Sequence, residues 1–167
     1  MHFRLYRSED FASLYAIEEV CFNPPLRFGR STMRELIESP TSATWIAEGD
    51  NGVAGFAIVE WTLEPGQALG QAPGHASDHA SAYIPTIEVS PQHRRRGIGV
   101  ELLRHLEASA SAAGATLIWL HVDAENEPAI RLYRAEGYRQ QGRHEHYYAR
   151  YRAANIYMKQ LHITSVE

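Results

Sequence analysis

The chain has 167 residues, 44% of them hydrophobic, and a formal net charge of -4 at pH 7. This length fits one domain with a buried core, and we expect residues 1–167 to form a single unit. The acidic balance argues against a nucleic-acid or membrane-surface binder, and the single cysteine, Cys21, excludes an internal disulfide. We expect a cytoplasmic protein, because the first residues lack a hydrophobic secretion segment.

The N-terminal quarter predicts one strand and two helices. Phe3 and Leu5 alternate with polar residues and indicate a strand, and Ser8 is expected to cap the helix that follows. The segment 22–30 contains two prolines and a glycine, which predict a shaped loop rather than a continuous helix. Ser31 is expected to begin the second helix.

A β-hairpin is predicted next. The runs 43–48 and 53–61 are rich in strand-forming residues and flank Asp50, Asn51 and Gly52, a strong turn signal. The segment 62–82 has no usable periodicity and is interpreted as an extended, mobile loop.

The second half predicts strands that alternate with helices. Ile98, Leu102 and Leu106 lie on one face of a helix that should pack on the sheet. A further helix has Pro128 in its first turn and ends at Gly137. Strands are predicted over residues 83–89, 117–122, 144–148 and 156–161.

A turn rich in arginine and glycine follows the strand 83–89. Such a turn before a helix aims backbone N–H groups outward, and the helix N-terminus adds positive dipole charge, so the segment can hold phosphate oxygens. Val100 and Glu101 stand where a nucleoside-triphosphate loop needs lysine and a hydroxyl, and Leu102 replaces the third glycine of a dinucleotide fingerprint. The remaining motif, Arg-x-x-Gly-x-Gly, spans residues 94–99.

A second motif follows the strand 117–122, with Asn126, Ala129, Leu132-Tyr133 and Gly137-Tyr138 in order. Together the two motifs resemble the GNAT acetyltransferase family, and the resemblance covers nearly the whole chain. It implies an α/β fold whose mixed sheet has splayed parallel fourth and fifth strands flanked by helices. It also implies that acetyl coenzyme A binds in the gap between these strands.

The resemblance assigns a role to residues of both motifs and of the fourth strand. The strand residues would pair with the coenzyme arm, and the turn would bind the diphosphate. The coenzyme-binding residues expected are Ile87, Glu88, Val89, Arg94, Arg95, Arg96, Gly97, Ile98, Gly99, Val100, Asn126 and Tyr133. Two alternatives stay open: Asn126 as a helix cap and Tyr133 as a core aromatic.

Within the family, the chain is most similar to protein N-terminal acetyltransferases, including the ribosomal-protein alanine type. Some of these enzymes use a tyrosine and a histidine as the base through a water molecule. The matching segments here are Tyr83, Ile84 and Thr86 on the fourth strand and Leu120, His121 and Val122 on the fifth. Bacterial ribosomal-protein relatives usually have glutamate in place of His121.

The resemblance predicts how the transfer of an acetyl group to an amine would be divided among side chains. His121 with Tyr83 would take the proton of the amine, Glu88 is an alternative base, and Tyr133 would donate a proton or hydrogen bond to the departing thiolate. A histidine hydrogen-bonded inside the sheet is the alternative for His121. Residues expected to contact the acceptor are Phe22, Pro24, Leu26, Tyr147 and Tyr148.

Three other functions are alternatives to this one. A GNAT enzyme acting on a small amine, such as an antibiotic, polyamine or amino acid, is the main alternative. A coenzyme-binding module without catalysis would not need Tyr83, His121 and Tyr133 together. Histidine pairs such as His75 and His79 lack further ligands, so we predict no metal. The chain is expected to be a monomer or homodimer.

Overall fold

The computed structural model describes residues 1–62 and 80–162. Its strands form one seven-stranded sheet with the order β1-β2-β3-β4-β5-β7-β6. Only β4 and β5 are parallel; every other neighbouring pair is antiparallel. The strands are β1 (His2–Leu5), β2 (Ser42–Gly49), β3 (Gly52–Trp61), β4 (Ser81–Val89), β5 (Leu117–Asp123), β6 (Arg139–Ala149) and β7 (Arg152–Gln160).

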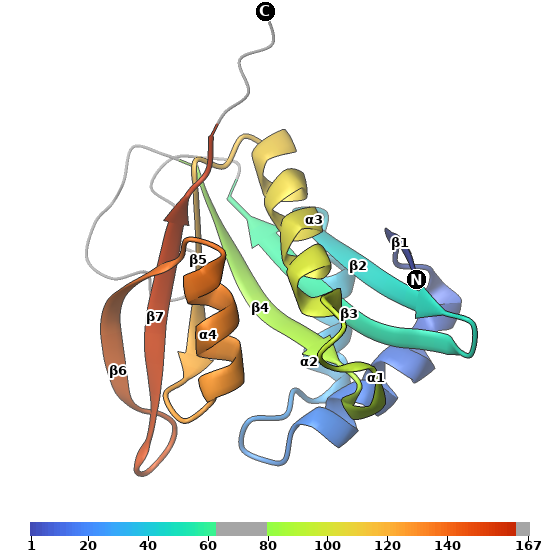
Figure 1. Cartoon of the computed structure of the whole chain (residues 1–167), viewed down its shortest axis with the longest axis horizontal. Helices are drawn as coiled ribbons and strands as arrows, with labels where there is room; N and C mark the ends of the chain where they lie inside the picture. The colour runs from blue at the N-terminus through green and yellow to red at the C-terminus, as the bar shows by residue number, and fades with distance from the viewer. Residues whose placement is uncertain (63–79, 163–167) are drawn as a thin grey trace, which may run out of the picture.

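Helices cover both faces of the sheet (Figure 1). The core under α3 and α4 contains most of the buried residues of β4 and β5, and a second core under α1 and α2 contains Ile46, Phe56 and Ile58. The helices are the 3-10 turn η1 (Ser8–Asp10), α1 (Phe11–Cys21), α2 (Arg30–Glu38), the 3-10 turn η2 (Pro91–His93), α3 (Ile98–Ala112) and α4 (Glu127–Ala135). Within the described residues, no helix is both long and apolar enough to cross a membrane.

The predicted order of elements is confirmed, and the predicted boundaries are wrong in several places. Ser8 begins η1 rather than capping α1, because Asp10 turns back to accept the N–H of Arg7 at 2.7 Å and the Arg4 guanidinium. The second helix begins one residue before Ser31, at Arg30, since Gly29 takes the N-cap position.

The C-terminal strands are longer than predicted. β6 and β7 extend over 139–149 and 152–160 because the antiparallel pairing continues past the apolar residues that marked them. The predicted loop 62–82 ends earlier than predicted, because Ser81 and Ala82 belong to β4 and pair with β5. Its residues 63–79 lie outside the described part of the chain.

The separation of β4 from β5 is the feature that creates the site. The two strands pair only from Ser81 with Leu117 to Ile84 with Leu120. Past that point β4 pairs with β3 alone and β5 pairs with β7 alone. Pro85, which has no N–H to donate, lies where the pairing ends. Figure 1 shows the two strands diverging from there, so the predicted splayed strands are confirmed.

Gly55 holds the free half of β4 close to β3. A Cβ at this position would lie 2.6 Å from the carbonyl oxygen of Glu88, a distance at which the backbone must shift. For comparison, a Cβ added to Gly142 in β6 would be 3.6 Å from the Cδ1 of Ile156, which is an ordinary van der Waals contact. Only glycine therefore allows the observed register of β3 on β4.

We predict that Gly55→Ala lowers the free energy of unfolding by about 1–3 kcal/mol, the usual effect of overpacking. Gly142→Ala is the matched control in another strand of the sheet and should cost less. Urea unfolding of both variants checks this. Equal stability of the two variants would show that β3 and β4 tolerate a wider spacing.

Candidate active site

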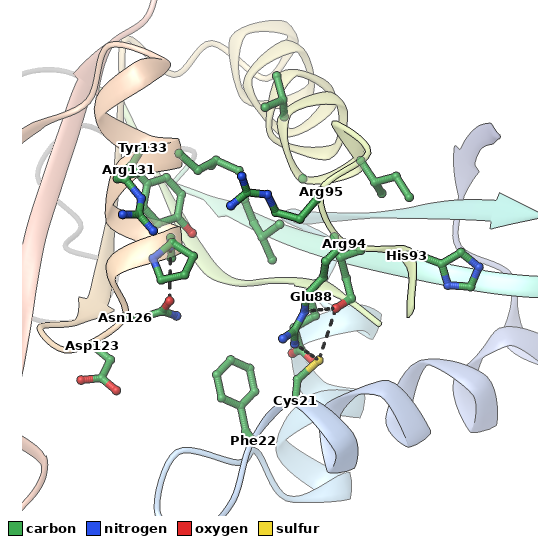
Figure 2. A pocket seen from close by; sticks show the side chains of 18 of the residues that line it. Cys21, Phe22, Glu88, His93, Arg94, Arg95, Asp123, Asn126, Arg131 and Tyr133 are labelled. Carbon is green, nitrogen blue, oxygen red and sulfur yellow. Dashed lines mark hydrogen bonds between the residues drawn. The ribbon is translucent and has the colours of Figure 1, made fainter. Parts of the chain in front are cut away.

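A cavity of about 860 Å³ lies in the gap between β4 and β5. Its walls come from the end of α1, the free half of β4, the turn before α3, and α4, as Figure 2 shows. The predicted coenzyme residues that line it are Ile87, Glu88, Val89, Arg94, Arg95, Gly97, Ile98, Gly99, Val100, Asn126 and Tyr133. Arg96 does not line the cavity. The structure thus brings eleven of the twelve predicted coenzyme residues together.

The turn before α3 has the backbone expected of a phosphate-binding segment. Gly97 is the N-cap residue of α3 and has a left-handed backbone with φ of 77°. A Cβ added to Gly97 would meet no atom within 4 Å, so this side of the turn is open. The first N–H groups of a helix have no partner within the helix, so the α3 N-terminus can bind an anion here.

Arg94 connects three elements of the structure through its side chain. Its Nε donates to the carbonyl of Val89 at 3.0 Å, and its guanidinium lies 3.4 Å from the Sγ of Cys21. These contacts tie the turn to the end of β4 and to α1. Arg95, which has a positive φ of 65°, lines the cavity together with Arg94, Arg131 and Arg152, so it is one of the arginines available to an anionic ligand.

Asn126 and Tyr133 position α4 against the cavity. The Asn126 side chain accepts the N–H of Ala129 at 3.3 Å, which confirms its helix-cap role; contact with a coenzyme stays a prediction. Tyr133 is buried beneath the cavity wall, and burial raises the pKa of its phenol. The phenol therefore keeps its proton at neutral pH and can donate a hydrogen bond.

A second group of predicted residues lies on the opposite face of the sheet. Leu120 and Val122 pack under α3 and α4, so His121 between them points to the other face. There the Tyr83 hydroxyl is 2.9 Å from His121 Nδ1. The Tyr147 ring stacks on the imidazole at 4.2 Å and meets Tyr148 edge-on.

The environment of His121 keeps it uncharged. Burial, with a smaller effect from the charge of His144, lowers the pKa of His121 to about 4. Burial also raises the pKa of Tyr83, so the phenol stays protonated. In the tautomer whose Nδ1–H donates to Tyr83, the Nε2 lone pair has no partner among the described residues and is free to accept a proton.

The predicted acceptor residues are divided between these two places. Phe22 and Leu26 line the cavity, and Pro24 does not. Tyr83, His121, Tyr147 and Tyr148 form an aromatic group, and none of the four lines the cavity. The predicted acceptor residues Tyr147 and Tyr148 are therefore grouped with His121, and Phe22 and Leu26 are grouped with the predicted coenzyme residues.

Glu88, the alternative base, is buried with its carboxyl against Thr86 and Glu18. The Thr86 hydroxyl donates to it at 2.7 Å, and burial together with Glu18 raises its pKa. A protonated carboxyl cannot take a proton from an amine, so this environment favours His121 as the base.

Several residues that line the cavity were not predicted from the sequence. Cys21 lies on its wall, and Asp123, at the end of β5, pairs with Arg152 at 2.6 Å. Neither has a motif that could have marked it. In the described parts, 1–62 and 80–162, no group of three or more potential ligand side chains could hold a metal ion.

We predict that Tyr147→Ala raises the pKa of His121 from about 4 toward 6.5, because the stacked ring keeps water from the imidazole. Tyr151→Ala removes an exposed ring from the same hairpin and is the matched control. NMR titration of the imidazole measures both. An unchanged pKa in Tyr147→Ala would show that this ring does not cause the desolvation.

The same shift predicts a pH dependence of stability. The pKa of folded His121 lies below its ordinary value, so the unfolded chain binds more protons between pH 6.5 and 4. The contribution of His121 is therefore fully present above pH 6.5 and is lost as the pH falls toward 4. His121→Gln should reduce this acid sensitivity in urea unfolding measured across that range; the full wild-type sensitivity in this variant would contradict the shift.

Two curated relatives act on different kinds of amine, according to their names. Streptothricin acetyltransferase of Streptomyces lavendulae is 36% identical over 102 residues, which cover 60% of this chain and 47% of the relative. A [ribosomal protein bS18]-alanine N-acetyltransferase of Salmonella typhimurium is 32% identical over 99 residues, 59% of this chain and 56% of the relative. The matched segments thus span about half the length of these relatives.

Among solved structures, NAA60 of Arabidopsis thaliana in complex with a bisubstrate analogue has a TM-score of 0.80 and 22% identity. The match covers 95% of this chain and 97% of that protein, so the two share the fold. The same plant protein has been solved with acetyl-CoA. The model of the Acetyltransferase (GNAT) family matches residues 11–138, and this chain belongs to that family.

Proposed function

We propose that this protein is an acetyl-CoA-dependent N-acetyltransferase whose acceptor is the α-amine of a protein or peptide N-terminus. The observation that carries the proposal is the gap between β4 and β5, with an anion-binding turn on one side and the uncharged His121–Tyr83 pair on the other. Family membership supports the acetyl transfer. The arrangement would bring a bound thioester and an incoming amine together across the sheet.

The cavity fits acetyl-CoA by the chemistry of its walls. The backbone of residues 86–89 has no strand partner on the side facing β5, so its N–H and C=O groups can pair with the amides of the coenzyme arm. The α3 N-terminus and Arg95 would hold the diphosphate. Bound acetyl-CoA supplies the acetyl thioester, and these residues orient it.

On the acceptor side, the protein would remove one proton from the attacking amine. A chain-terminal amine has a reference pKa of about 7.7–8.0 and is partly neutral at pH 7, whereas the lysine value is about 10.4. The weak base His121 therefore needs only to take the proton released as the amine attacks, directly or through a water. Tyr133, kept protonated by burial, would donate a hydrogen bond to the departing thiolate.

Two observations favour a peptide acceptor. The Tyr147 and Tyr148 rings form a wall beside His121, and Phe22 and Leu26 line the cavity near the end of α1. Such apolar and phenolic surfaces suit the first side chains and the backbone of a peptide. One relative named for an alanine N-acetyltransferase agrees with this choice.

A small amine is the second candidate acceptor. The relative named as a streptothricin acetyltransferase has the higher identity of the two reported, 36%. A screen of N-terminal peptides against free small amines, with mass detection of the modified nitrogen, separates the candidates. Acetylation of small amines alone would overturn the peptide proposal.

We predict that His121→Ala lowers kcat for the acceptor by about a hundredfold, the lower range of general-base effects, with little change in acetyl-CoA affinity. Steady-state kinetics and calorimetry check the two parts. Tyr151→Ala, on the nearby hairpin, is the control. Full activity of His121→Ala together with loss of activity in Glu88→Gln would identify Glu88 as the base instead.

We predict that Gly97→Trp weakens acetyl-CoA binding by about tenfold or more, because the ring would occupy the open side of the turn and strain its left-handed backbone. Gly114→Trp is the matched control, since Gly114 also has a positive φ, 94°, and open space but does not line the cavity. Calorimetry that gives equal affinity for both variants would remove the turn from the binding site.

A further inference from the structure

Two carboxyl groups are buried against each other between α1 and β4. Glu18 is 0% exposed and Glu88 is 2% exposed, and burial together with the neighbouring Glu18 raises the pKa of Glu88. Within the described chain, the Oε2 atoms of both residues are buried and have no hydrogen-bond partner. Two buried carboxylates would repel each other strongly, whereas one shared proton satisfies both free oxygens. The raised pKa keeps Glu88 protonated, so the two carboxyls can lie together between α1 and β4.

Each carboxyl is also fixed to its surroundings through its other oxygen. The Oε1 of Glu88 accepts the Thr86 hydroxyl at 2.7 Å, which holds it on β4. The Oε1 of Glu18 accepts the backbone N–H of Phe28 at 2.7 Å, ten residues along the chain. The Tyr15 hydroxyl donates to the carbonyl of the same Phe28 at 2.9 Å. Two side chains of α1, Glu18 and Tyr15, thus form hydrogen bonds with the backbone N–H and C=O of Phe28.

The segment held in this way, residues 22–28, forms part of the cavity wall. Arg27 donates to the carbonyls of Phe22 and Glu19 at 2.9 Å, so the segment is folded on itself and on the end of α1. Phe22 and Leu26 line the cavity, and Figure 2 shows Phe22 close to Cys21, on the side of the cavity away from α4. Fixing Phe28 therefore fixes the apolar wall that Phe22 and Leu26 provide.

We propose that Glu18 is a positioning residue for the acceptor: its carboxyl, paired with Glu88 on β4 and bonded to the Phe28 N–H, holds the wall segment 22–28 against the cavity. The inference rests on the proposed function, because it assigns the wall to the acceptor. Among the hydrogen bonds of the described residues, Glu18 accepts the Phe28 N–H and has no bond to the coenzyme turn or to His121. Loss of the pair should loosen the wall and leave the chemistry of His121 and Tyr133 in place.

The kinetic test compares three variants on peptides that begin with Ala and with Met. Glu18→Ala removes both hydrogen bonds of the carboxyl and should raise KM for the peptide about tenfold, with kcat and the KM for acetyl-CoA within about twofold. Glu18→Gln keeps an oxygen for Phe28 and a hydrogen-bonding group for Glu88, so it should restore the peptide KM to within about twofold of wild type. Glu19→Ala, an exposed carboxylate on the same helix, is the matched control and should behave as wild type.

Amide hydrogen exchange of Phe28, followed by NMR, tests the contact without any acceptor. In the wild-type protein this amide should exchange more slowly than the other amides of segment 22–28, and Glu18→Ala should accelerate it about tenfold or more. Fast exchange of Phe28 in the wild type overturns the inference even if Glu18→Ala does not fold. A peptide KM equal in Glu18→Ala and Glu19→Ala also overturns it. If no peptide is acetylated by the wild type, the proposed function fails, and the Phe28 exchange still decides whether Glu18 holds the wall.

Discussion

The site depends on one constraint, the point at which β4 and β5 stop pairing. In parallel strands that remain paired, the backbone N–H and C=O groups form hydrogen bonds with each other, and no room is left for a ligand. Here the ladder ends at Ile84 and Leu120, and neighbouring strands support each free half from the outside. The close approach at Gly55 keeps β4 against β3 while its other edge stays free. The result is a rigid opening lined by unpaired backbone.

This opening separates two kinds of chemistry by the two faces of the sheet. On the side of α3 and α4, the walls offer backbone donors, the α3 N-terminus and Arg95, which suit an anionic ligand. On the other side, Tyr83, Trp119, His121 and Tyr147 form an aromatic group whose imidazole is uncharged.

The sequence predicted the elements, the splayed strands and most of the cavity lining, because each leaves a local pattern. The segment Leu120, His121 and Val122 marked the candidate base, and the spacing from Arg94 to Gly99 marked the turn before α3. Boundaries set by long-range contacts were missed, as at Asp10, whose bond to Arg4 decides where α1 begins.

The burial of Glu18 is only weakly indicated by the sequence. Helical spacing places this residue on the core face of α1, but glutamate is usually exposed. Its partner Glu88 lies 70 residues away in the chain, and no local pattern connects them. The same holds for Asp123 and Arg152, which meet only because β5 pairs with β7. Pairs of this kind depend on tertiary packing and need the structure.

The central claim is that acetyl-CoA binds along the free edge of β4 and at the α3 N-terminus. Amide hydrogen exchange with and without acetyl-CoA tests it most directly, because it reports on each backbone group in turn. The account predicts slower exchange for amides of residues 86–89 and 97–99 when the coenzyme is present. Unchanged exchange in both segments, with protection appearing elsewhere in the chain, would contradict it.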